Sequence, residues 1–122
     1  MAAEIKPKLG GETKMKAGLI WFNGHMVPQE QAKVSVLSHA LHYGTSVFEG
    51  IRAYETPQGA AVFRLPEHVE RFFHSAKVMM FEMPFSPQEV SEGILSVIRD
   101  NGYKSCYIRP LAWMGGRSLG VN

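Results

Sequence analysis

The sequence has 122 residues, of which 45% are hydrophobic and 20% are charged, and its formal net charge is +2. This length and balance fit one domain with a core of moderate size. Residues 1–17 carry four lysines against two glutamates and so account for the whole net charge, which leaves no basic face for a nucleic acid. The single cysteine excludes an internal disulfide and offers no metal cluster.

The two ends of the chain differ in composition from its centre. Residues 1–18 are rich in glycine and lysine, bury too little apolar area to offset chain entropy, and are expected to form a flexible leader. Residues 19–115 are expected to form the domain, and residues 116–122 have the composition of the start of an interdomain linker. No apolar run approaches the roughly 20 residues that span a bilayer, and no signal peptide is evident, so a cytoplasmic protein without membrane contact is expected.

In chain order, the first expected element is a β-hairpin. Asn23 and Gly24 separate apolar runs at 19–22 and 25–27, and an Asn-Gly pair adopts the positive φ angles of a type I′ turn at little cost. Ser38 is expected to cap a short helix over residues 38–46. The next predicted elements are a strand over 48–54, a turn over 56–59 and a strand over 60–65.

Two longer helices are predicted in the second half of the chain. Pro66 suits the first position of a helix that runs to about residue 80, with its apolar residues on one stripe. Ser86 and Glu89 form a capping-box pattern for a second helix, which an Asn-Gly pair ends. A last strand is predicted over 105–113. This order predicts an α+β domain with a mainly antiparallel sheet and two helices packed on one face.

Each of the two long predicted strands has one face that suits a core and one that does not, because side chains alternate along a strand. One face carries Phe48, Gly50, Arg52 and Tyr54, and in the last strand Tyr107, Arg109, Leu111 and Trp113. The opposite face carries Glu49, Ile51 and Ala53, and in the last strand Cys106, Ile108, Pro110 and Ala112. The small apolar residues of the second face suit packing under the helices, whereas the first face offers aromatic rings and two arginines.

Spacing alone leaves two interpretations of these arginines open. Arg52 and Arg109 either lie in water on a half-solvated sheet face or converge in an anion-binding pocket with aromatic walls, since guanidinium groups bind carboxylates through two N–H groups. Arg71 points about 140° away from the centre of the apolar helix stripe, toward solvent, a ligand or a second domain. His39 and His42 have the spacing of a metal pair but no third ligand, so hydrogen-bonded histidines are expected instead of a metal site.

Residues 38–54, which read SHALHYGTSVFEGIRAY, resemble the signature of the branched-chain amino acid aminotransferases. Further similar segments stand in the family's order at 20–24, 62–64, 68–71, 75–77 and 107–111. The resemblance extends over nearly all of residues 19–122 and corresponds to the N-terminal small domain of these fold-type IV enzymes. It implies pyridoxal 5′-phosphate as the cofactor, which acts as an electron sink.

The resemblance also implies roles for single residues. Arg71 would bind the cofactor phosphate, a task suited to a planar guanidinium. The expected substrate-binding residues are Tyr43, Phe48, Gly50, Arg52, Tyr107, Arg109, Leu119 and Val121. Within this set, Tyr43, Phe48 and Gly50 would contact the aliphatic side chain of Leu, Ile or Val, and Arg52 would belong to the polar wall of the pocket. Tyr107 would approach the substrate carboxylate, and Arg109 would contact the side-chain carboxylate of glutamate or 2-oxoglutarate. Leu119 and Val121 would cap the pocket of a neighbouring subunit in a homo-oligomer.

The resemblance covers about the first third of a typical family member. The Schiff-base lysine and the acidic partner of the pyridine nitrogen would lie in a large domain beyond residue 122, and none of the seven lysines present matches the catalytic one. The chain alone is therefore expected to be inactive and not to retain the cofactor, and its partner would be the missing large domain. A D-amino acid aminotransferase, an aminodeoxychorismate lyase and a non-enzymatic partner-binding remnant stay open as alternatives.

Overall fold

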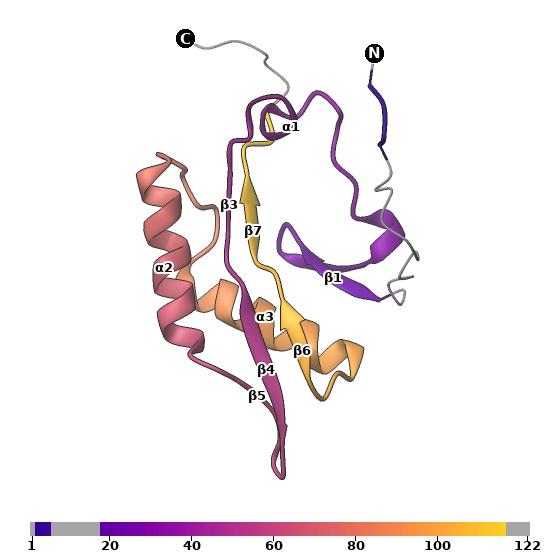
Figure 1. The fold of residues 1–122 in the computed structure, drawn as a ribbon, viewed down its shortest axis with the longest axis vertical. Helices are drawn as coiled ribbons and strands as arrows, with labels where there is room; N and C mark the ends of the chain where they lie inside the picture. Colours follow the sequence, from indigo (N-terminus) through magenta and orange to yellow (C-terminus); the bar gives the residue numbers. More distant parts are fainter. Residues whose placement is uncertain (1, 6–17, 117–122) are drawn as a thin grey trace.

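The structure, a computed structural model, describes residues 2–5 and 18–116 (Figure 1). Most of the expected leader lies outside these residues, as does nearly all of the expected linker with Leu119 and Val121. The described part has helices and antiparallel strands, and the predicted α+β class is confirmed. No helix among the described residues is long and apolar enough to cross a membrane.

The predicted hairpin at the start of the domain is confirmed. Strands β1 (Leu19–Phe22) and β2 (His25–Pro28) pair antiparallel, and Phe22 lies opposite His25. Asn23 and Gly24 have φ angles of 49° and 91°, as the type I′ turn requires. A 3-10 turn, η1 (Gln29–Gln31), follows the second strand, and from there the chain runs to the top of the molecule as drawn in Figure 1.

The short helix α1 (His39–Tyr43) is shorter than the predicted helix over 38–46. Gly44 ends it, because the left-handed φ of 67° at this position breaks the helical path. Ser38 precedes the helix as expected, but its side chain makes no capping hydrogen bond. The chain can therefore turn directly from α1 into β3 (Ser46–Phe48).

The two long strands predicted from the sequence are each interrupted at one point. Residues 48–54 contain the end of β3 and the start of β4 (Ile51–Thr56), and residues 105–113 contain β6 (Cys106–Ile108) and β7 (Leu111–Trp113). The Glu49 N–H donates to the Pro110 carbonyl oxygen at 3.0 Å, but Pro110 has no N–H to return the bond. The prediction of two continuous strands was wrong for this reason. The register nevertheless does not change across the gap, since Phe48 lies opposite Leu111 and Ile51 lies opposite Ile108.

The last strand of this sheet, β5 (Gly59–Val62), is shorter than the predicted strand over 60–65. It pairs antiparallel with the outer part of β4, so that the sheet order is β5-β4-β6. Arg64 adopts a left-handed φ of 58° and directs the chain into α2 (Leu65–Val78). That helix ends two residues earlier than predicted, before Met80 with its positive φ.

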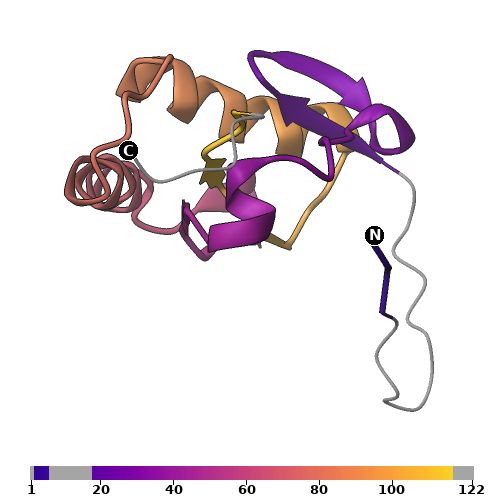
Figure 2. The ribbon, with the colours of Figure 1, turned by 90° about the horizontal axis from the view of Figure 1, so that it is seen from above.

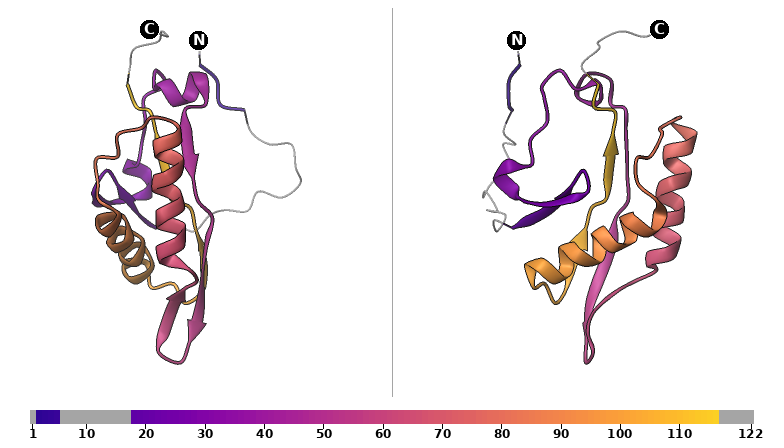
Figure 3. Two further views of the ribbon diagram at one scale, coloured as in Figure 1. Left: turned by 90° about the vertical axis from the view of Figure 1, so that its left-hand side faces the viewer. Right: turned by 180° about the vertical axis from the view of Figure 1, so that it is seen from behind.

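The two longer helices pack on the same face of the sheet, as predicted. Helix α3 (Pro87–Asn101) starts with the expected capping box, in which the Ser86 side chain accepts from Glu89 N–H and the Glu89 carboxylate accepts from Ser86 N–H. Figure 2 shows α2 along its axis and α3 lying across it, and Figure 3 shows α3 crossing the back of the long strands. The buried core consists of Ile51, Ala53, Val69, Phe72, Ala76, Val90, Ile94, Ile98 and Ile108.

The β1–β2 hairpin is fastened to α3 at two points. The Asn101 side chain accepts from Leu19 N–H at 2.8 Å and donates to the Leu19 carbonyl at 3.0 Å. Further along the helix, the Trp21 indole lies against Gly93, and a Cβ atom added at Gly93 would come within 2.8 Å of two indole carbons. Gly93 is therefore required by the close approach of the hairpin, in a helix position where alanine would otherwise be preferred.

We predict that Gly93→Ala lowers the free energy of unfolding by about 1–3 kcal/mol, because the overlap with the indole outweighs the helix propensity of alanine. Urea denaturation followed by tryptophan fluorescence measures this difference. Glu92→Ala is the matched control, since it introduces alanine one residue earlier, at an exposed position. If Gly93→Ala were as stable as the control, the close contact between the Trp21 indole and residue 93 would not be what requires glycine there.

Candidate functional site

The outward face of the strand pair β4–β6 carries aromatic rings and arginines in mutual contact. Arg109 lies with its guanidinium carbon 4.2 Å from the centre of the Phe48 ring and 5.5 Å from that of Tyr107. The guanidinium carbon of Arg52 also lies over the Tyr107 ring, 5.6 Å from its centre. Arg109 also donates a hydrogen bond from its NH2 group to the Tyr107 hydroxyl at 2.8 Å. The two guanidiniums therefore converge on one tyrosine, but Arg52 and Arg109 are both exposed, and an anion-binding pocket at this place stays a prediction.

The register of the strands accounts for this cluster. Arg52 lies directly opposite Tyr107 in the ladder, and the same register carried across the gap brings Gly50 beside Arg109. The absence of a side chain at Gly50 leaves room for the Tyr107 phenol, which a Cβ atom at this position would overlap. The four side chains of the cluster are all exposed in the described part of the structure, so the cluster lies on its surface: Phe48, Arg52, Tyr107 and Arg109. A face of this kind can bind an anion beside apolar surface.

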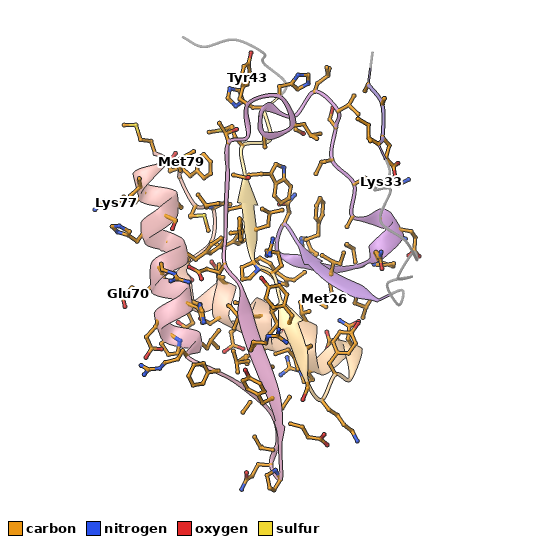
Figure 4. The ribbon with its side chains drawn as sticks, viewed as in Figure 1. Met26, Lys33, Tyr43, Glu70, Lys77 and Met79 are labelled. Atoms are coloured by element: carbon orange, nitrogen blue, oxygen red, sulfur yellow. The ribbon has the colours of Figure 1, made fainter. Side chains whose placement is uncertain are left out.

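Tyr43 is not part of this cluster in the described structure. It lies on α1, where its ring stacks obliquely on His39 with ring centres 4.4 Å apart. Figure 4 shows it projecting from α1 at the end of the molecule, away from β4 and β6. The His42 Nε2 lies 2.7 Å from the Val36 carbonyl oxygen and must donate to it, and His39 pairs with Thr45 at 2.8 Å. Both histidines thus hold α1 in place, as their expected hydrogen-bonding role implies, and the described residues contain no group of three metal-ligating side chains.

Arg71 pairs with Glu49 on the opposite side of the strand. Its Nε donates to Glu49 Oε1 at 2.6 Å and its NH2 donates to Glu49 Oε2 at 2.7 Å, so the pair is bidentate. His68, one helical turn before Arg71, lies with Nδ1 3.0 Å from the same Oε2. The side chain of Glu49 is 3% exposed, whereas that of Arg71 is 67% exposed. The helix geometry left three neighbours open for the Arg71 side chain, namely solvent, a ligand or a second domain. The structure shows that this side chain also has a buried partner within the domain, Glu49.

The ion pair explains how Glu49 stays charged on a buried face. Hydrogen bonds from Arg71 lower the pKa of the Glu49 carboxyl below its ordinary value, and they outweigh the opposing effect of burial. Glu49 in turn raises the pKa of the Arg71 guanidinium. Sequence reasoning placed Glu49 on the inward face but gave it no role. The signal was present, because a lone carboxylate among apolar inward residues needs a partner, and His68 and Arg71 share one helix face.

A cleft of about 700 Å³ lies between the β1–β2 hairpin, α3 and the strands β6 and β7. Its walls are mostly apolar and include Phe22, Val97 and Trp113. Tyr107 and Arg109 of the arginine cluster line its rim, whereas Phe48, Gly50 and Arg52 do not, so the cleft overlaps the cluster only in part. The candidate site is therefore the open outward face of the sheet together with the Glu49–Arg71 pair beside it.

The family model for amino-transferase class IV matches residues 46–122. The chain belongs to the class IV aminotransferase family. The matched region begins at β3 and includes both the arginine cluster and the Glu49–Arg71 pair. The resemblance of residues 38–54 to fold-type IV aminotransferases is thereby confirmed at the level of the class IV family.

Several relatives are named branched-chain amino acid aminotransferases. That of Escherichia coli K12 is 54% identical over 110 residues, which is 90% of this chain and 36% of the relative, and that of Pseudomonas aeruginosa is 45% identical over 104 residues, which is 85% of this chain and 34% of the relative. A crystal structure of the T.th. enzyme is 71% identical with a TM-score of 0.86, covering 89% of this chain and 37% of that one. The chain thus spans about a third of the length of these relatives. The T.th. structures include complexes with N-(5′-phosphopyridoxyl)-L-glutamate, with pyridoxamine 5′-phosphate and with 4-methylvaleric acid.

We predict that Glu49→Gln destabilises the fold at neutral pH and that the loss diminishes in acid. The folded-state pKa of Glu49 is lowered, so the ion pair contributes stability above the ordinary value of 4.5, and that contribution is lost as the pH falls through the folded-state pKa. Thermal unfolding of both proteins between pH 7 and pH 3 measures the difference. Glu67→Gln is the control, because the Arg64–Glu67 pair is exposed on both sides. If the melting temperatures of Glu49→Gln and of the unsubstituted protein differed by the same amount at all pH values, the stabilising role of the charged Glu49 carboxylate would be contradicted.

Proposed function

We propose that this chain is the N-terminal small domain of a branched-chain amino acid aminotransferase. The parent enzyme would transfer the amino group between leucine, isoleucine or valine and 2-oxoglutarate with pyridoxal 5′-phosphate. The observation that carries the proposal is the cluster in which the Arg109 guanidinium is hydrogen-bonded to Tyr107 and stacked on Phe48. The chain that holds this cluster is 71% identical to a branched-chain amino acid aminotransferase of known structure. The relatives' names and complexes supply the substrate class, and the geometry supplies residues that fit it.

The substrate side must accept two chemically different side chains. Leucine needs apolar contact, and glutamate needs a cation at the same place. Phe48 offers a ring for the first, and the guanidinium of Arg109, stacked on that ring, offers free N–H groups for the second. Arg52 would form part of the polar wall, and Gly50 would let the substrate approach the strand. Tyr43, Leu119 and Val121 would complete the pocket, the last two in a neighbouring subunit of a cytoplasmic homo-oligomer.

The cofactor side depends on Arg71. Pyridoxal 5′-phosphate, when bound, supplies an electron sink for the amino-group transfer. Arg71 fits its phosphate because the guanidinium is largely exposed and Glu49 occupies only two of its five N–H groups. Residues beyond this chain would supply the lysine of the reaction. The lysines among the described residues are Lys33, Lys77 and Lys104, and all three are exposed; Lys33 and Lys77 point outward in Figure 4.

We predict that Arg109→Leu in the parent enzyme separates the two substrates. The kcat/KM for 2-oxoglutarate should fall about 100-fold, as expected for the loss of a charged hydrogen-bonded contact, while the half-reaction with leucine changes less than about threefold. Arg64→Leu is the matched control, since Arg64 also stacks on an aromatic ring, that of Phe63 at 5.9 Å, but lies outside the cluster. Equal losses for both substrates, or turnover of D-alanine or aminodeoxychorismate in place of leucine, would contradict the proposed substrate class.

We also predict that the 122-residue chain alone does not turn over leucine with 2-oxoglutarate, because by the family resemblance none of its seven lysines matches the catalytic one. A coupled glutamate assay at micromolar protein and excess pyridoxal 5′-phosphate tests this expectation, with the parent enzyme as the positive control. Absorbance near the cofactor bands after gel filtration tests retention of pyridoxal phosphate. Stoichiometric cofactor retention or measurable turnover by the chain would overturn the prediction.

A further inference from the structure

The bidentate pair with Glu49 leaves one defined edge of Arg71 free. A guanidinium has five N–H groups, and Glu49 takes the one on Nε and one on NH2. Three remain, two on NH1 and one on NH2, and no other hydrogen bond of Arg71 is found within the described residues. The side chain is 67% exposed, so a further acceptor from outside the domain has room to reach the guanidinium. An anion can reach Arg71 only along this edge without displacing Glu49.

Glu49 itself is held from several directions. Its Oε2 contacts both Arg71 and His68, and its Oε1 contacts Arg71. Its backbone N–H donates to the Pro110 carbonyl at the interruption of the strand pair. The side chain is 3% exposed. A carboxylate fixed in this way cannot rotate freely, and it therefore fixes the plane of the guanidinium that it binds.

A purely structural role for the pair explains these features less well. An apolar residue at position 49 would pack with Ile51 and Ala53 on the inward face, and buried ion pairs are weak contributors to stability compared with such packing. The pair also differs from the exposed Arg64–Glu67 pair, which has one hydrogen bond of 3.3 Å and leaves both side chains more than half exposed. Burying the carboxylate costs desolvation, and what it gains is the fixed orientation of one long, flexible arginine.

We propose that Glu49 is a positioning residue that holds Arg71 so that its NH1 edge meets the cofactor phosphate, with His68 anchoring the carboxylate. The inference rests on the proposed function, since the anion is the phosphate of pyridoxal 5′-phosphate. Glu49 also directly follows Phe48, whose ring supports Arg109 on the outward face. The adjacent residues Phe48 and Glu49 thus place one arginine on each side of the sheet: Phe48 supports Arg109 on the substrate side, and Glu49 holds Arg71 on the phosphate side.

The test compares the affinity of the parent apoenzyme for pyridoxal 5′-phosphate and for pyridoxal, which lacks the phosphate. Glu49→Gln should weaken binding of the phosphorylated compound about 10-fold or more, the effect of one charged hydrogen bond, and leave binding of pyridoxal within about twofold. Arg71→Ala should show the same selectivity. In the double variant Glu49→Gln/Arg71→Ala, the loss should equal that of Arg71→Ala alone, because Glu49 acts only through Arg71. Glu67→Gln is the control with no expected effect on either compound.

The outcomes separate this inference from the proposed function. If Arg71→Ala leaves the affinity for pyridoxal 5′-phosphate unchanged, the phosphate assignment itself fails. If Arg71→Ala has the expected effect but Glu49→Gln weakens both compounds equally, or adds to the loss in the double variant, only the positioning role fails. Should Glu49→Gln not fold, His68→Ala removes the anchor alone and must show a smaller loss restricted to the phosphorylated compound; a loss for both compounds, or none, overturns the inference.

Discussion

A single antiparallel register runs through the paired segments 46–53 and 106–113, and both parts of the candidate site are placed by it. Because side chains alternate along each strand, this register sends Phe48, Arg52, Tyr107 and Arg109 to one face and Ile51, Ala53 and Ile108 to the other. A slip of one residue would exchange the two sets. The apolar contacts of the inward set with α2 and α3 hold the register, so the core determines where the arginines lie.

The same register also buries a charged side chain, that of Glu49. Glu49 belongs to the inward set by position, and its carboxylate would be strongly unfavourable there without partners. Arg71 and His68 remove that penalty by hydrogen bonding from one face of α2. The exposed guanidinium is at the same time the one group of this described pair that can meet an anion. The burial of one charge and the presentation of the other are thus two consequences of one contact.

Pro110 interrupts the strand pairing because it has no backbone N–H. Without an N–H it cannot complete the pair of hydrogen bonds opposite Glu49, and the ladder is open there while the strands stay in step. The opening lies where the outward cluster and the inward ion pair are closest along the chain. Gly50, which follows, leaves space for the Tyr107 phenol across the gap. A proline and a glycine on opposing strands therefore shape the site without contributing a polar side chain to it.

Much of this arrangement is determined by local sequence. The Asn23-Gly24 turn, the Ser86 capping box and the alternation of residues 48–54 depend on neighbours in the chain, and each is found as predicted. The motif in 38–54 also identified the family. The tertiary structure decided what local pattern cannot contain: the pairing of Glu49 with Arg71 across 22 residues, and the convergence of two arginines on Tyr107. Periodicity gives the direction of a side chain from its own element, but which groups meet depends on how the strands and helices pack, and that is set by the core as a whole.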